Sequence, residues 1–188
     1  MIQNKPLSIG FIGGSIESAV GQTHQIACKM DGRWKLVSGC FSRQPDVNKK
    51  TAEHWGLGAQ QTYGNWIELL ESEQDKLDAI VILTPTPSHA EIIIKALSLG
   101  YAVICEKALT SSTEQAKQIA DTLNHYKGFL AITYNYSGYP MVRELQALIQ
   151  EGTLGKIQQI PNILLHCGTM SIYQQIFCFF IMPCDMQV

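Results

Sequence analysis

Two short polar segments follow apolar runs, at positions where their side chains could take part in chemistry. Thr-Pro-Thr-Pro-Ser-His at 84–89 follows the apolar run 79–83, and Glu-Lys at 106–107 follows the run 102–105. If both runs are buried parallel strands, their carboxyl ends meet at one edge of a sheet, where ligands bind. The lysine ammonium could there stabilise an alkoxide that forms while hydride leaves a secondary alcohol. The alternative is an exposed ion pair that contributes little.

The glycine-rich segment 13–21 is a third candidate site, and it follows the first apolar run of the chain. Gly13 and Gly14 permit a tight turn, and a helix beginning after it offers free N–H groups and a positive dipole end to a phosphate. Ser15 occupies the second position of the Gly-x-Gly-x-x-Gly pattern, and three extra residues precede Gly21. The segment therefore predicts either a dinucleotide-binding turn or a turn without a ligand, and its place after a first strand favours binding.

The residues about twenty positions beyond this turn bear on which dinucleotide is expected. NAD sites usually carry Asp or Glu there to hold the ribose hydroxyls. This chain has Phe41, Ser42 and Arg43 instead. A carboxylate that would repel a 2′-phosphate is absent, and the guanidinium could pair with one. The pattern favours NADP over NAD, and the alternative is that Arg43 is a solvated surface charge.

Apolar periodicity places these segments in an alternating series of strands and helices. Strands are expected at 7–12, 36–41, 79–83, 102–105 and 129–133, and helices at 20–30, 45–55, 66–71, 88–99, 111–125 and 142–150. Such alternation predicts an α/β fold, a doubly wound and mainly parallel sheet like that of Rossmann dinucleotide-binding domains. In this fold Gly13, Thr84 and Lys107 gather at one edge of the sheet.

Several motifs occur in the order that characterises a known family. Besides the segments above, the chain has Tyr-Asn-Tyr at 134–136 and Gly-Thr-Leu-Gly-Lys-Ile at 152–157. Over residues 7–160 the chain resembles the Gfo/Idh/MocA family of oxidoreductases. The resemblance implies hydride transfer between a nicotinamide cofactor, NAD or NADP, and a secondary alcohol of a sugar or cyclitol.

The resemblance also implies roles for single residues. Lys107 is implied to be the catalytic residue, directed at the substrate, with Glu106 on the cofactor side. His89 either donates to a ribose or phosphate oxygen or is a structural histidine at a helix start. Two positions depart from the family pattern, since Thr86 replaces Asn and Ala108 replaces a Pro that would restrain φ. The residues expected at the cofactor are Gly13, Gly14, Ser15, Gly21, Ser42, Arg43, Thr84, Pro85, Thr86, His89, Glu106 and Asn135, and no metal is expected.

The resemblance predicts a dinucleotide-binding domain over 1–160 and indicates that the family's second α/β domain is missing. That domain supplies an acid–base histidine and most substrate contacts in the family. Residues 161–188 show no clean period, so they are either a remnant packed on the sheet edge or, as we prefer, a segment foreign to the fold, such as an out-of-frame reading. Three functions stay open: the oxidoreductase, a truncated module that binds a dinucleotide without catalysis, and an unstable truncation product.

Composition narrows the class of protein further. The 188 residues are 46% hydrophobic and 16% charged, with a formal net charge of −2, which suits one soluble globular core. Such a charge gives no attraction to nucleic acid or anionic lipid. The six cysteines show no metal-binding spacing, and the late apolar stretch 176–182 is too short to span a membrane. With no signal peptide evident, these features predict a cytoplasmic protein with reduced cysteines, acting on a small molecule, and leave its oligomeric state open.

Overall fold

The computed structural model of the chain describes residues 5–156, apart from the side chains of Asn135 and Tyr136. These residues belong to two compact units, one that ends at Ile132 and one that begins at Thr133. The predicted domain boundary at 160 and the predictions for 161–188 lie outside the described residues and stay predictions. No helix within residues 5–156 is long and apolar enough to cross a membrane.

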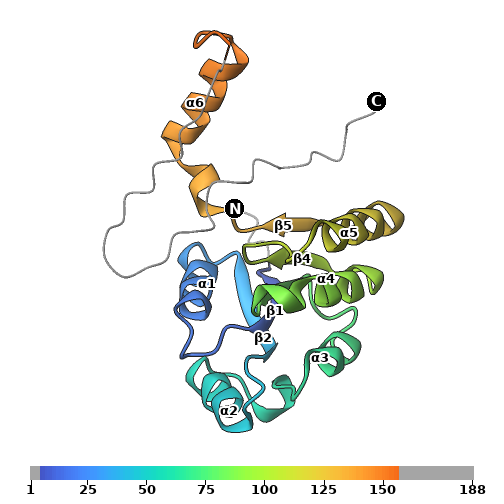
Figure 1. Cartoon of the computed structure of the whole chain (residues 1–188). Helices are drawn as coiled ribbons and strands as arrows, with labels where there is room; N and C mark the ends of the chain where they lie inside the picture. Colours follow the sequence, from blue (N-terminus) through green and yellow to red (C-terminus); the bar gives the residue numbers. More distant parts are fainter. Residues whose placement is uncertain (1–4, 157–188) are drawn as a thin grey trace. The chain divides into compact units, whose positions relative to one another are not determined.

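The first unit is built on a parallel sheet of five strands (Figure 1). The strands are β1 (Leu7–Gly13), β2 (Trp34–Cys40), β3 (Ala79–Leu83), β4 (Ala102–Cys105) and β5 (Leu130–Ile132), and the helices are α1 (Ala19–Met30), α2 (Pro45–His54), α3 (Trp66–Ser72), α4 (His89–Ser98) and α5 (Thr113–Tyr126). The strand order β2-β1-β3-β4-β5 reverses direction between β1 and β3. The structure thus confirms the predicted doubly wound α/β fold, whose ligand site lies at such a reversal.

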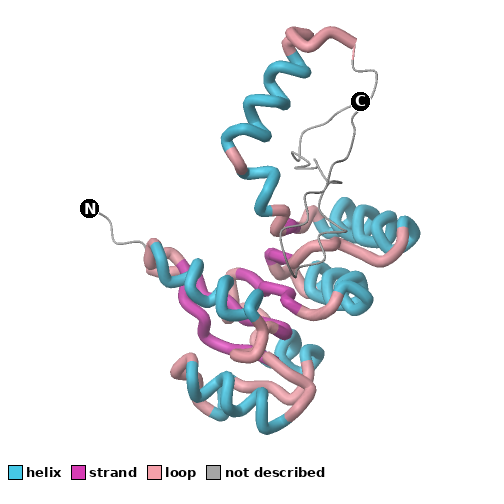
Figure 2. Tube along the Cα trace, turned by 60° about the vertical axis from the view of Figure 1, so that its left-hand side comes forward, coloured by secondary structure: helices cyan, strands magenta, loops and turns pink. Residues whose placement is uncertain are grey.

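Helices cover both faces of the sheet, as Figure 2 shows. Alternate side chains of β3 divide between two apolar clusters because successive residues of a strand point to opposite faces. Ile80 and Ile82 pack in one cluster with residues of α3, α4 and α5, whereas Ala79 and Val81 pack in the other with Ala52 of α2. All five residues of β3 are buried, as its continuous apolar sequence predicted.

Polar side chains fix where the helices begin. The Ser18 hydroxyl caps α1, and the Asn65 amide oxygen caps α3 by accepting from Glu68 N. Helix α5 begins at Thr113, two residues later than predicted, because Ser112 rather than Ser111 is its N-cap. The Ser112 hydroxyl accepts from Gln115 N at 3.2 Å, and the Gln115 side chain accepts from Ser111 N, one residue before the N-cap, at 3.2 Å.

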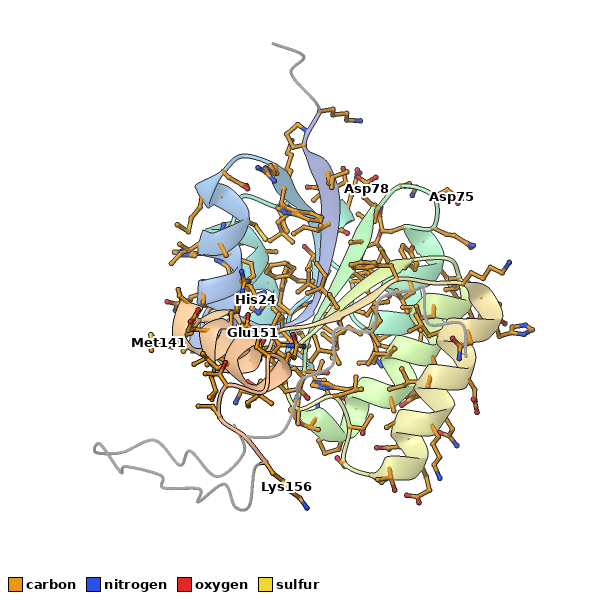
Figure 3. All side chains as sticks on the ribbon, turned by 90° about the horizontal axis from the view of Figure 1, so that it is seen from above. His24, Asp75, Asp78, Met141, Glu151 and Lys156 are labelled. Atoms are coloured by element: carbon orange, nitrogen blue, oxygen red, sulfur yellow. The ribbon has the colours of Figure 1, made fainter. Side chains whose placement is uncertain are left out.

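The described part of the second unit consists of a 3-10 turn, Asn135–Gly138, and helix α6 (Pro140–Gln150). Pro140 stands in the first turn of α6, where its missing N–H costs no hydrogen bond. Met141, Leu145 and Ile149 are exposed and lie four positions apart on one face of α6. Met141, Glu151 and Lys156 are labelled in Figure 3.

A replacement at the end of α5 tests how this helix terminates. Lys127 has φ +50°, in the left-handed region that favours glycine. We expect Lys127→Gly to raise the free energy of unfolding by about 1 kcal/mol, because glycine adopts this conformation without strain. Urea denaturation followed by circular dichroism measures the change. Lys117→Gly inside α5 is the matched control and should lower stability by about 1 kcal/mol; a loss for both variants would contradict the assignment.

Candidate functional site

The carboxyl ends of β1, β3 and β4 lie side by side and form what we call the carboxyl edge of the sheet. Gly13 pairs with Leu83, and Ile82 pairs with Cys105. The main chain continues the same register one residue further, where Glu106 N donates to Ile82 O at 2.9 Å. The residues that follow these strands, among them Thr84 and Lys107, therefore stand at one edge, as the sequence predicted.

The glycine turn needs glycine for steric reasons. Gly13 and Gly14 have φ values of +82° and +73°. A Cβ on Gly13 would lie 2.8 Å from the carbonyl carbon of Leu83, and one on Gly21 would lie 2.1 Å from Gly14 O. Gly21 thus allows α1 to pack closely against the turn. It corresponds to the third glycine of the Gly-x-Gly-x-x-Gly pattern, although three extra residues precede it. Gly13, Gly14 and Gly21 therefore present no Cβ where the turn meets the first turn of α1, and we call this place the glycine cradle. Such close main-chain approach is typical of turns that bind a pyrophosphate.

The extra residues of the turn are held by its own polar groups. Ser18 N donates to Ser15 O at 2.8 Å, and the Ser18 hydroxyl accepts from Gly21 N at 3.2 Å. The Gln22 side chain donates to Ile16 O at 2.6 Å. Ser15 therefore sits in a closed, hydrogen-bonded turn although it replaces a glycine of the usual pattern.

His89 joins the Thr84 segment to the Lys107 segment. Its imidazole has no exposed surface, with Nε2 2.7 Å from Thr84 O and Nδ1 2.8 Å from Ala108 O. Because both partners are acceptors, a neutral ring donates to one of them and an imidazolium to both. This geometry favours the structural alternative over a cofactor contact. It also fixes the main chain after Lys107, where the family's proline is absent.

The rest of segment 84–89 forms a compact turn above β3. Thr86 begins a short 3-10 turn that ends at Ser88, and the Ser88 hydroxyl lies 2.8 Å from both Thr84 Oγ1 and Pro85 O. Pro85 is exposed, and Thr84 and Thr86 are half-buried. These residues line the carboxyl edge beside the glycine turn, and their cofactor contacts stay predictions.

Glu106 is bound to α1 through His24, a residue that sequence reasoning missed. His24 Nε2 lies 2.9 Å from Glu106 Oε1, and the two side chains are only 17% and 16% exposed. Glu106 Oε2 also accepts from Lys107 N at 3.1 Å. Figure 3 labels His24 on α1. The one feature of the sequence that could have pointed to His24 is its position three residues after Gly21, within one helical turn of the cradle.

Cys105 directly precedes Glu106 and Lys107, but its thiol is not a nucleophile. Burial, together with the nearby Glu106 charge, raises the pKa of the Cys105 thiol to about 12. The thiol donates to Glu106 O at 3.3 Å. It is therefore neutral at physiological pH and acts as part of the core.

The segment after β2 stands at the same edge, beyond β1. Phe41 is buried against Trp55, with ring centroids 5.1 Å apart, and the Ser42 hydroxyl accepts from Gln44 N at 3.1 Å. Arg43 is exposed. The pairing of Arg43 with a 2′-phosphate stays a prediction, and the side chain of Asn135 lies outside the described residues.

A parallel sheet with a glycine cradle at its strand reversal defines a dinucleotide-binding protein of the Rossmann type. Residues 7–134 match the family described as an oxidoreductase family with an NAD-binding Rossmann fold. The chain therefore belongs to this family, the Gfo/Idh/MocA oxidoreductases, as its motifs predicted. The match also confirms the expected class of cofactor.

Relatives and solved structures agree with this assignment. The chain is 30% identical over 174 residues to the uncharacterized oxidoreductase YfiI of Bacillus subtilis, covering 89% of this chain and 44% of the relative. It is 32% identical over 123 residues to a D-xylose 1-dehydrogenase [NADP(+)] of Haloarcula marismortui, covering 64% and 32%. An inositol dehydrogenase homolog from Azotobacter vinelandii, solved with NADH and myo-inositol, superposes with a TM-score of 0.75 and 28% identity, covering 81% and 41%. The chain thus spans less than half the length of these proteins.

Replacing His89 separates its two possible roles. We expect His89→Phe to lower the free energy of unfolding by about 2 kcal/mol or more, because the carbonyl groups of Thr84 and Ala108 lose the buried imidazole that joins them. Urea denaturation measures the change, and His125→Phe, at an exposed histidine near the end of α5, should change stability by less than about 0.5 kcal/mol. Unchanged stability combined with weaker cofactor binding would instead assign His89 to the cofactor.

Proposed function

We propose that this chain binds a nicotinamide dinucleotide along the carboxyl edge, with the pyrophosphate in the glycine cradle and the nicotinamide toward Lys107. One observation carries the proposal: the strand register sets Gly13 beside Leu83 and Glu106 beside Ile82, so the three segments adjoin. The N-terminus of α1 supplies N–H groups and a positive dipole end for the phosphates. The bound cofactor would accept or deliver hydride.

The adenosine end of the cofactor would lie at the end of β2. A ribose next to the glycine turn reaches the residues that follow this strand. Arg43 is exposed there, and the segment Phe41 to Arg43 holds no carboxylate to repel a 2′-phosphate. These features support NADPH as the preferred cofactor. One relative, the D-xylose 1-dehydrogenase of Haloarcula marismortui, is named for NADP(+).

The substrate end of the site would be served by Lys107. Its main-chain N–H is bound by the Glu106 carboxylate, and the carbonyl of Ala108 is bound by His89, so the lysine is fixed on both sides. An ammonium carried on a main chain fixed in this way would stabilise the oxyanion that develops at a secondary alcohol as hydride leaves. Relatives named for inositol and D-xylose support a sugar or cyclitol as the substrate class.

A second candidate function is dinucleotide binding without turnover. Both histidines that adjoin the carboxyl edge in residues 5–156 are engaged by the protein, His24 by Glu106 and His89 by two carbonyl groups. Within these residues, Lys107 is therefore the side chain best placed to act on the substrate hydroxyl. A general acid–base partner contributes a factor of about 100 or more to such reactions. Because both histidines are engaged, the described residues support binding of the dinucleotide better than rapid turnover.

Titration and a turnover assay test this proposal. We expect the chain to bind NADPH and NADH, seen as a change in the fluorescence of the reduced nicotinamide. Oxidation of myo-inositol or D-xylose with NADP+ or NAD+ should fall about 100-fold in Lys107→Met, which removes the charge at similar length, while cofactor affinity changes little.

Lys117→Met, at an exposed position of α5, is the matched control and should behave as the unchanged chain. Failure to bind either dinucleotide would overturn the proposed function. Equal oxidation rates for Lys107→Met and the unchanged chain would remove Lys107 from the chemistry. Binding without turnover in the unchanged chain would establish the second candidate function.

A further inference from the structure

One face of α2 carries two buried polar side chains that the proposed cofactor contacts do not include. Asn48 is 6% exposed and Thr51 is 0% exposed. They are three positions apart, so they share a helix face. Burying an amide or a hydroxyl is unfavourable unless its polar atoms find partners. Their partners therefore indicate what these two residues do.

Asn48 holds the main chain that follows β2. Its Oδ1 accepts from Phe41 N at 2.8 Å, with a longer contact of 3.4 Å to Ser42 N. Its Nδ2 donates to Tyr63 O at 2.8 Å. The side chain thus fixes the two residues immediately before Arg43, at the place proposed for the ribose of the cofactor.

Thr51 holds the glycine turn. Its hydroxyl accepts from Ile16 N at 3.2 Å and donates to Val47 O at 2.7 Å. Ile16 belongs to the extra residues that separate Gly14 from Gly21. A single face of α2 therefore contacts both the phosphate cradle and the ribose segment, whose spacing must match that of one dinucleotide.

We propose that Asn48 and Thr51 are positioning residues for the cofactor. Thr51 sets the turn that meets the pyrophosphate, and Asn48 sets the segment that distinguishes a 2′-phosphate from a 2′-hydroxyl. This inference rests on the proposed dinucleotide binding. Because NADH and NADPH share the pyrophosphate, loss of the Thr51 contact weakens both equally. Because only NADPH carries the 2′-phosphate, loss of the Asn48 contact changes the ratio of the two affinities.

Titration of the full chain with NADH and NADPH tests the inference. We expect Thr51→Val, which keeps the shape of the side chain, to weaken both affinities about five-fold, the effect of one lost hydrogen bond. Asn48→Ala should weaken NADPH about five-fold more than NADH. Asn48→Ser, which keeps a small polar group, should shift the ratio in the same direction and serves if the alanine variant does not fold.

Two matched controls remove comparable hydrogen bonds elsewhere. Asn65→Ala deletes the cap of α3, and Thr122→Val deletes a hydroxyl bond to Gln118 O within α5. Both should leave the affinities and their ratio unchanged. Urea denaturation identifies the conditions in which every variant is folded during the titration.

A double variant separates positioning from a general loss of structure. Arg43→Ala alone should remove most of the preference for NADPH, and in that background Asn48→Ala should no longer change the ratio, since the two residues act through one contact. The inference would be overturned if Asn48→Ala left the ratio of NADPH to NADH affinity unchanged. It would also be overturned if Asn48→Ala changed this ratio equally with and without Arg43. In both cases the proposed function would stand. Absence of binding by the unchanged chain would overturn both.

Discussion

The register of three parallel strands is the constraint on which the rest of the structure depends. Gly13 lies opposite Leu83 at a distance that leaves no room for a Cβ, and Ile82 lies opposite Cys105. Since parallel strands end at the same edge, the glycine turn and the segments after β3 and β4 must adjoin. A one-residue slip would place Leu83 on the opposite face of the sheet and shift these segments relative to one another.

Two histidine contacts hold the segment after β4 in place at this edge. His89 binds the carbonyl of Ala108, where the family pattern has a proline, and thereby fixes the main chain after Lys107. His24 binds the Glu106 carboxylate and links α1 to the same segment. Each contact is buried or nearly so, which makes it costly to lose and therefore effective in holding the edge in one arrangement.

The sequence predicted the sheet and its edge well, because these follow from local apolar patterns. The run 79–83 was predicted with its exact bounds, and Gly13, Thr84 and Lys107 stand at one edge as expected. The sequence did not reveal the pairing of His24 with Glu106, 82 positions apart, since no local pattern encodes a contact between distant segments. The same holds for Asn48 and Thr51, which read as ordinary helix residues until their main-chain partners are known.

Hydrogen–deuterium exchange of the full chain, with and without NADPH, tests most directly whether one nucleotide is bound by all three segments. Binding as described should slow the exchange of main-chain amides in 13–21, 84–89 and 105–108 together, because each segment loses access to solvent or mobility on the same event. Slowed exchange in one of these segments alone, or at the opposite edge of the sheet around 99–102, would contradict the account.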